Sequence, residues 1–301
     1  MEPARSRGAD WLVLILLALI WGSSFILMKR GLFHDGEPVL TPFQLASARL
    51  SIAWLALSPI LFKHFRLIGK HWLPLMGAGV LGNGIPAFLF ATAQTKIDSS
   101  LSGMLNSLTP LMTLIAGALL FGMRFRAVHV IGVVLGLGGA AALIMLKQEA
   151  GMPSWSAYAL LPVIATAMYG INGNIIKNHL YSLPPTAISA LALTFVGPIC
   201  IGLAIFSGLP ETVTTHPHGW SAFGHVVVLA VFGSAFALVL WNVLLKRTTA
   251  LWASSVTYLM PIVAIGWGIF DHEYITWPQI LMIGLVLGGV YLVSVAEKRG
   301  G

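Results

Sequence analysis

Blocks of about 20 apolar residues recur along the whole chain, separated by short polar gaps. A helix of that length crosses the roughly 30 Å hydrocarbon layer of a bilayer. The pattern therefore predicts ten membrane-spanning helices and no extramembrane domain. The predicted ranges are 10–30, 41–62, 72–93, 99–121, 127–147, 155–177, 184–207, 221–245, 251–270 and 277–296.

Composition supports the same fold class. Of the 301 residues, 57% are hydrophobic and only 9% are charged, and the mean hydropathy is +0.87. Soluble domains carry roughly 25% charged residues, so this chain lacks the residues for a fully hydrated surface. We predict an all-α polytopic membrane protein whose first helix is not a cleaved signal, because its apolar run is longer than a typical signal core. The single cysteine, Cys200, excludes an intrachain disulfide.

The net charge of +7 comes from basic residues in the gaps, where they act as topology signals rather than as a nucleic-acid surface. With the N-terminus inside, twelve basic residues fall in inner segments and four in outer ones. The inner set is Arg5, Arg7, Lys63, Arg66, Lys70, Arg124, Arg126, Lys177, Lys246, Arg247, Lys298 and Arg299, and the outer set is Lys29, Arg30, Lys96 and Lys147. We therefore expect both termini in the cytoplasm.

The sequence repeats itself at an offset of roughly 150 residues. "WGSSFILMKRG" (21–31) aligns with "YGINGNIIKNH" (169–179), and "SLTPLMTLIAGALLFG" (107–122) with "YLMPIVAIGWGIFDHE" (258–273). The two units, 1–147 and 148–301, each hold five predicted helices. Because five is odd, the second unit enters the bilayer from the opposite side. Such inverted repeats are typical of transporters with a site near the bilayer midplane.

At these residues the chain resembles the EamA family of the drug/metabolite transporter superfamily. The resemblance rests on "WGSSFILMK", "TPFQLASARL", "SSLSGMLNSLTPLMTLIAGALLFG" and "IGVVLGLGGAAALI". Within the family, the chain is most similar to the YddG-type exporters of aromatic amino acids. The resemblance implies a ten-helix carrier in the bacterial inner membrane that moves amphipathic amino acids outward. One departure is Met123, which stands where the family usually has a Glu after Gly122, whereas Glu273 supplies this acid in the second unit.

Two basic residues near or within the spans have open roles. Arg49 lies inside the second span, where a cation is costly. It is either a partner for a substrate carboxylate or a gating pair, or a structural anchor, and the anchor is favoured because the family motif includes this Arg whatever the substrate. Lys29 ends the first span on the outer side, where snorkelling is favoured over a role at the mouth of the transport path.

The remaining candidates are aromatic and polar residues that fall within the spans. Glycines and a proline around Asn83 in "LGNGIP" weaken the third helix, and Pro110 and Pro261 break the fourth and ninth, although tight packing explains such residues equally well. We expect the substrate site to draw on Trp21, Ser24, Asn83, Phe88, Asn106, Tyr169, Asn172, Trp241 and Tyr258.

The acidic residues lie in tails, loops or span edges, which favours a facilitator over a proton-coupled pump and argues against an intramembrane enzyme. We predict a secondary carrier that exports amino acids, with aromatic and other bulky apolar ones preferred. Efflux of drugs or other small metabolites is the alternative, and a water-filled channel is disfavoured. We expect a monomer in contact with lipid, with small-molecule cargo and with no nucleic acid, cofactor or metal.

Overall fold

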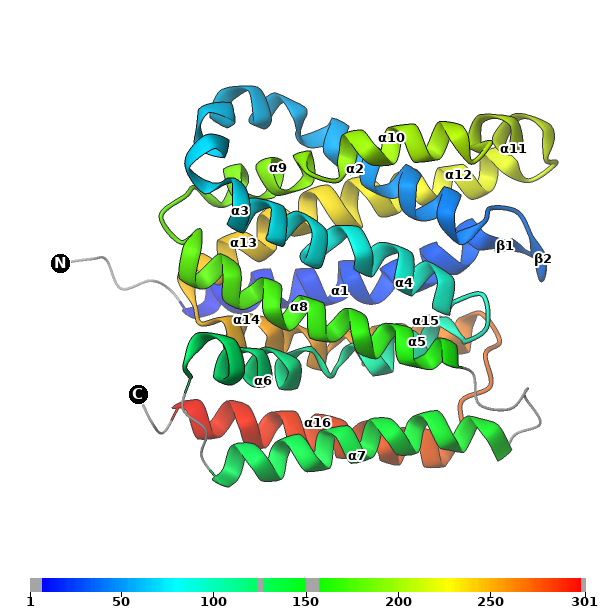
Figure 1. Cartoon of the computed structure of the whole chain (residues 1–301). Helices are drawn as coiled ribbons and strands as arrows, with labels where there is room; N and C mark the ends of the chain where they lie inside the picture. Colours follow the sequence, from blue (N-terminus) through cyan, green and yellow to red (C-terminus); the bar gives the residue numbers. More distant parts are fainter. Residues whose placement is uncertain (1–6, 124–126, 150–156, 299–301) are drawn as a thin grey trace.

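The computed structural model describes residues 7–123, 127–149 and 157–298, and this part of the chain is almost entirely helical (Figure 1). The strands within it are β1 (Phe33–His34) and β2 (Glu37–Pro38), which pair antiparallel between the first two helices. The turn that joins them places Asp35 and Gly36 at positive φ, 49° and 85°, a conformation that Gly and Asp tolerate.

The helices follow the predicted apolar blocks, and several blocks are divided into shorter pieces. The helices of the first part are α1 (Arg7–Leu32), α2 (Pro42–His64), α3 (Ile68–Gly79), α4 (Ile85–Ala93), α5 (Ser99–Asn106), α6 (Thr109–Phe121) and α7 (Ala127–Glu149). Those of the second part are α8 (Leu160–His179), α9 (Pro185–Thr194), α10 (Gly197–Phe206), α11 (Leu209–Thr215), α12 (Gly219–Val228), α13 (Ala237–Arg247), α14 (Ala250–Ser254), α15 (Met260–Phe270) and α16 (Trp277–Lys298).

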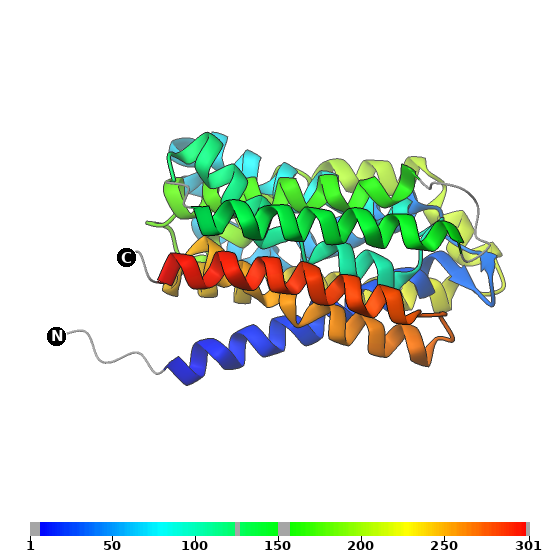
Figure 2. The same ribbon diagram turned by 90° about the horizontal axis from the view of Figure 1, so that it is seen from below.

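The long helices lie side by side in a bundle (Figures 1 and 2). The end of the bundle that holds β1 and β2 is here named the hairpin end; α1 begins and α16 finishes at the other end, named the opposite end. At one edge of the bundle, α7 and α16 pack along their lengths. Their glycines allow this close contact, because a Cβ on Gly289 would lie 2.5 Å from the backbone oxygen of Gly132.

The bundle carries its apolar side chains outward as well as inward, as a membrane protein does. Phe62, Leu119 and Phe206 are 80%, 77% and 91% exposed. Six helical stretches in the described residues are long and apolar enough to cross a membrane, or seven if the bent pair α9–α10 counts as one. The chain is therefore a helical, multi-pass membrane protein.

One of these stretches, Pro42–Ala93, is too long for a single crossing. At 1.5 Å per residue its 52 residues span about 78 Å, more than twice the hydrocarbon thickness. Backbone angles leave the helical range at His64 (φ −118°) and His71 (φ −120°), and the chain reverses direction there, so that α2 and α3–α4 run opposite ways (Figure 1). This stretch therefore contains two of the predicted spans.

Two helical spans are interrupted by π-helical turns at positions roughly 150 residues apart. These are η2 (Val80–Gly84), between α3 and α4, and η4 (Leu229–Phe236), between α12 and α13. A wider turn leaves backbone carbonyls without their usual helical partner, and π-helical turns are frequent at functional sites. In η4, the carbonyl of Gly233 accepts a hydrogen bond of 3.0 Å from Nε1 of Trp21.

Two further spans break at the expected prolines. Pro110 lies in the first turn of α6, after the break that follows α5, and Pro261 lies in the first turn of α15, after the short 3₁₀ turn η5 (Ser255–Tyr258). Proline is well placed at the first turn of a helix because that position needs no intrahelical N–H bond. Each span is thus two shorter helices joined by an irregular turn in the interior of the bundle.

Close helix contacts also recur at the repeat offset. A Cβ on Gly22 of α1 would lie 2.5 Å from Cβ of Val263 in α15. A Cβ on Gly170 of α8 would likewise lie 2.5 Å from the backbone carbon of Met112 in α6. Gly22 aligns with Gly170 and Met112 with Val263, so equivalent helices of the two units meet in equivalent ways.

Candidate functional site

A cavity of about 800 Å³, its open part included, lies where the irregular turns meet. Its walls come from the helices α1, α2, α4, α8, α13 and α15, together with η2, η4, η5 and the break between α5 and α6. Both sequence units therefore contribute to it.

Two aromatic pairs form much of the wall. Trp21 and Trp241 have ring centroids 5.5 Å apart, and Phe90 and Tyr169 are stacked at 6.1 Å with an interplanar angle of 16°. Trp21 aligns with Tyr169, and Trp241 lies roughly 150 residues after Phe90, so the pairs are equivalent in the two units. Phe25 packs on Phe90 with ring centroids 5.7 Å apart. Faces of this kind suit a flat or bulky apolar group.

Side-chain amides add polar groups to the wall. Nδ2 of Asn83 donates to the carbonyl of Ala78 at 3.3 Å, and Nδ2 of Asn106 lies 3.5 Å from the sulfur of Met260. Asn106 and Asn172 are buried, and their Oδ1 atoms accept no hydrogen bond from the residues that the structure describes. A buried acceptor without a partner costs about 1–3 kcal/mol, which is unusual in a well-packed interior.

Arg49 is the cation of the cavity wall. Its Nε donates a 2.7 Å hydrogen bond to Oγ of Ser234 in η4. Among the residues that the structure describes, no Asp or Glu lines the cavity and no carboxylate forms an ion pair with Arg49. The electrostatic character of the cavity is therefore positive.

The structure brings most of the predicted site residues together. Those that line the cavity are Trp21, Ser24, Arg49, Asn83, Asn106, Tyr169, Asn172 and Trp241. Their contact with a substrate stays a prediction. Three lie elsewhere: Phe88 packs on Phe43 with centroids 5.1 Å apart, Tyr258 packs against an apolar cluster beside the cavity, and Lys29 lies at the hairpin end.

Sequence reasoning did not select several residues of the wall. Phe25, Phe90 and Ser234 line the cavity, and so do Met28, Gly82, Thr109, Gly233, Leu238, Val256, Thr257 and Met260. Phe88 was placed in the predicted site and Phe90 was not, although both are aromatic residues of the same span. The wider π turn in η2 changes the angular position of every residue after it, by about 100° per inserted residue.

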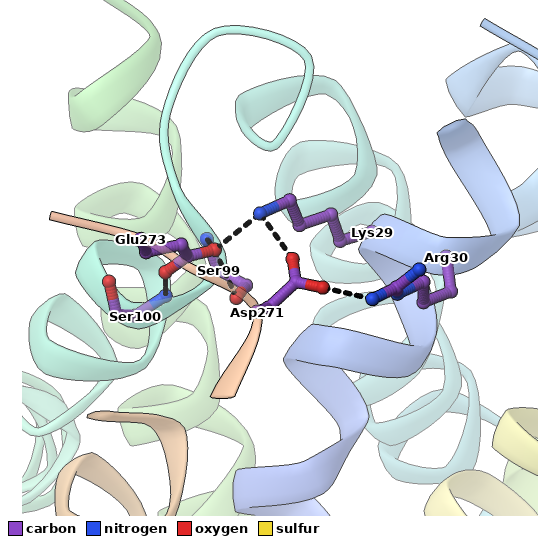
Figure 3. A network of polar contacts seen from close by, with 6 residues as sticks. All are labelled: Lys29, Arg30, Ser99, Ser100, Asp271 and Glu273. Atoms are coloured by element: carbon purple, nitrogen blue, oxygen red, sulfur yellow. Dashed lines mark hydrogen bonds and ion pairs between the residues drawn. The ribbon is translucent and has the colours of Figure 1, made fainter. Parts of the chain in front are cut away.

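An ion cluster lies at the hairpin end, formed by Lys29, Arg30, Asp271 and Glu273 (Figure 3). Nζ of Lys29 lies 2.6 Å from Oδ2 of Asp271 and 2.8 Å from Oε1 of Glu273, and Arg30 also pairs with Asp271. The sequence singled out Lys29 and Glu273 separately but gave no sign that they meet. We name these four residues the hairpin-end ion cluster.

Glu273 also holds the first turn of α5. Its carboxylate accepts from the backbone N–H groups of Ser99 (3.1 Å) and Ser100 (3.0 Å) and from Oγ of Ser99 (2.7 Å) (Figure 3). Burial alone would raise the pKa of Glu273, but the hydrogen bonds from Lys29, Ser100 and Ser99 outweigh it and lower that pKa to about 2. The carboxylate is therefore ionised at any physiological pH.

The opposite end has a different arrangement at the equivalent positions. Lys177, which aligns with Lys29, donates to the carbonyl of Leu245 at 3.0 Å and to that of Thr248. Met123 takes the place of Glu273: its backbone N–H bonds to Gly117 at 3.0 Å, just as that of Glu273 bonds to Gly268 at 2.8 Å. The lysine of this end thus binds helix-end carbonyls instead of a carboxylate.

Comparison with known proteins agrees with this architecture. The EamA-like transporter family matches residues 10–145 and 156–295. The chain belongs to the EamA-like transporter family. This confirms the resemblance drawn from the sequence, while the narrower YddG-type likeness stays a prediction. The family assignment makes the protein a membrane transporter.

Relatives over nearly the full length carry matching descriptions. An uncharacterized transporter of Archaeoglobus fulgidus is 24% identical over 94% of this chain and 98% of its own. The uncharacterized inner membrane transporter YedA of Escherichia coli K12 is 25% identical, with coverages of 94% and 90%. A probable amino-acid metabolite efflux pump of the same strain is 22% identical, with coverages of 94% and 94%.

The fold also has a counterpart among solved structures. One crystal structure superposes with a TM-score of 0.63, covering 98% of this chain and 99% of the other, at 19% sequence identity. At that identity the match shows a shared fold alone.

Proposed function

We propose that this transporter is a secondary carrier that exports amino acids with aromatic or other bulky apolar side chains across the bacterial inner membrane. The observation that carries the proposal is the cavity between the two units, walled by the pairs Trp21–Trp241 and Phe90–Tyr169. An aromatic ring gains about 0.5–1.5 kcal/mol per ring partner beyond the area it buries. The relative described as a probable amino-acid metabolite efflux pump supports the same cargo.

The carrier works by alternating access between two inverted units, 1–147 and 148–301, that cross the membrane ten times in total. Equivalent contacts such as Gly22–Val263 and Gly170–Met112 support the repeat, and rocking of one unit against the other exposes the cavity to each side in turn. The charge pattern supports cytoplasmic termini, which makes the hairpin end periplasmic. Of the residues behind this orientation, Arg5, Arg124, Arg126 and Arg299 lie outside the described residues.

Transport runs down the gradient of the amino acid, as a uniport. The reason is the lack of an acidic residue among those that line the cavity. Proton-coupled carriers commonly use an intramembrane carboxylate that binds and releases a proton during the cycle. Without such a group the cargo gradient alone supplies the driving force.

Flux into proteoliposomes tests the proposal. Purified protein is reconstituted, and uptake of labelled Phe, Trp, Leu, Met and Thr is measured with and without a pH gradient, against empty liposomes. We expect saturable flux, fastest for Phe and Trp, that an imposed pH gradient does not drive. Absence of flux for all five would contradict amino-acid transport. Competition by a nucleoside or by methyl viologen, with no flux of amino acids, would favour efflux of drugs or other metabolites.

A further inference from the structure

Arg49 lines the cavity, and part of its guanidinium is without a hydrogen-bond partner among the described residues. Only its Nε is engaged, by Oγ of Ser234 at 2.7 Å; Nη1 and Nη2 make no hydrogen bond to the residues that the structure describes. A guanidinium carries five N–H donors in a fixed plane. Once Nε is taken, the edge formed by Nη1 and Nη2 is the part that presents two parallel donors.

An arginine that serves only as an anchor has a different environment. In membrane proteins, buried cations pair with an acid or with helix-end carbonyls, because an uncompensated charge away from water is costly. Lys177 is compensated in this way, because its ammonium group donates to the carbonyls of Leu245 and Thr248. Arg49 instead bonds to a serine hydroxyl on an irregular turn, and no acidic side chain lines the cavity to neutralise it.

We infer that Arg49 binds the carboxylate of the transported molecule through Nη1 and Nη2. This inference rests on the proposed function and narrows its cargo to molecules with a carboxylate beside a bulky apolar group. Two parallel N–H donors match the two oxygens of a carboxylate, and the charge-assisted pair is stronger than a neutral hydrogen bond. Ser234 is a positioning residue, because its hydroxyl fixes the plane of the guanidinium.

The cavity wall also offers contacts for the side chain and the amino group of the transported molecule. When its carboxylate is bound to Arg49, the transported molecule can pack its own side chain against the aromatic residues of the wall. These are Trp21, Phe90, Tyr169 and Trp241. The amino group meets only neutral acceptors there, such as the amides of Asn106 and Asn172. The carboxylate is therefore the charged group that the cavity selects, and a cargo without it loses more than one without the amino group.

Matched cargo molecules separate a carboxylate-binding role from a structural one. Concentration-dependent flux in proteoliposomes is compared for L-phenylalanine, L-phenylalaninamide, which lacks the carboxylate, and 3-phenylpropionate, which lacks the amino group. The wild-type protein is expected to prefer phenylalanine over its amide at least tenfold. In Arg49→Gln the KM for phenylalanine and 3-phenylpropionate rises about 10- to 100-fold while that for the amide stays within twofold. Arg49→Lys keeps part of the preference, because a point charge remains without the bidentate fork.

Two further variants complete the design. Arg66→Gln, at an exposed site in η1 (Phe65–Leu67), makes the same substitution away from the cavity and should leave all three KM values unchanged. Ser234→Ala should lower the acid-to-amide preference without abolishing it. Thermal unfolding in detergent identifies any variant that fails to fold, and the graded preferences of Arg49→Lys and Ser234→Ala then still test the role.

The outcomes distinguish this inference from the proposed function. Equal losses for acid and amide in a folded Arg49→Gln protein would overturn carboxylate binding while leaving amino-acid transport intact. If the wild-type protein transports none of the three, the export proposal fails, and binding is read from the fluorescence of the cavity tryptophans instead. Quenching by 3-phenylpropionate that disappears in Arg49→Gln would still support the carboxylate site; equal quenching in both proteins, or none in either, would overturn it.

Discussion

Nζ of Lys29 lies 2.8 Å from Oε1 of Glu273, which joins the end of α1 to the segment between α15 and α16 (Figure 3). The same carboxylate holds the backbone N–H groups of Ser99 and Ser100 at the start of α5. Three segments from both sequence units thus meet at one acid. Under the proposed alternating access, we propose that Lys29 and Glu273 separate when the hairpin end opens, so that the cluster stabilises the state in which this end is closed.

Replacing Lys29 by Met should shift the carrier toward the state open at the hairpin end. The substitution removes the only cation on Glu273 within the described residues and leaves Asp271 paired with Arg30 alone, while it keeps a similar apolar stem. The closed state therefore loses the two charge-assisted contacts of Lys29. The shift is measured with a cysteine probe in the cavity, Ser24→Cys, placed in a Cys200→Ala background. Labelling by a membrane-impermeant maleimide from outside should become about tenfold faster.

Exchange of the two charges provides the control for this variant. Lys29→Glu combined with Glu273→Lys restores an attractive pair and should return the labelling rate toward that of the parent protein, although Ser99 and Ser100 then lack their acceptor. Unchanged labelling and unchanged flux in Lys29→Met would mean that the lysine only anchors the helix end, and would contradict a role in gating.

The low pKa of Glu273 predicts how stability depends on pH. Its folded-state pKa of about 2 lies below the unfolded value of about 4.3, so the ionised carboxylate stabilises the fold above the unfolded pKa. That contribution, about 2–3 kcal/mol by the size of the shift, is lost as the pH falls from about 4.5 toward 2. Between pH 5 and 8 it is constant.

Thermal unfolding of Glu273→Gln against wild type checks this prediction. The difference in melting temperature should be constant from pH 8 to pH 5 and should shrink below about pH 4.5. Glu211→Gln, an exposed acid at the same end of the bundle, provides the control and should show no comparable difference at any pH. A difference that already changes between pH 7 and 5 would show that Glu273 titrates in that range and would contradict the low pKa.

The unequal ends of the bundle give a third prediction. Met123 occupies at the opposite end the position that Glu273 has at the hairpin end, and its sulfur lies over Gly117 beside Asn174. Lys177 follows Asn174 by about one helical turn on the same face of α8. Met123→Glu therefore places a carboxylate within reach of Lys177, adds an ion pair to the closed state of this end, and should lower export several-fold.

Flux in three variants separates this ion pair from a change of side chain alone. Met123→Gln has a similar size without charge and should export more rapidly than Met123→Glu. The double variant Met123→Glu with Lys177→Met removes the pair and should recover flux relative to Met123→Glu. If the double variant is as slow as the single one, the acid acts by some route other than Lys177.

The helical, multi-pass class of the fold was predictable because apolar blocks of about 20 residues match the thickness of the bilayer. The repeat also paired Trp21 with Tyr169, and both residues line the cavity. Phe90 was left out of the predicted site, and no sequence pattern reveals how far the π turn η2 changes the helical phase of the residues after it. The pairing of Lys29 with Glu273 was missed because 244 residues separate them and no local spacing rule connects two helix ends.

The last prediction concerns Oδ1 of Asn172, whose replacement should raise the stability of the fold and lower the transport rate. Its buried Oδ1 accepts no hydrogen bond from the described residues, so Asn172→Leu, of similar size, removes an unsatisfied acceptor and should stabilise the fold by about 1–3 kcal/mol. Transport should fall because an amide is lost from the cavity wall, as expected where function maintains a destabilising group.

Asn174→Leu is the matched control two residues away. Nδ2 of Asn174 donates to the carbonyls of Thr113 and Gly170, both at 2.9 Å, so the loss of this side chain should lower the melting temperature. Equal destabilisation by both substitutions would show that Asn172 is a satisfied structural residue and remove it from the candidate site.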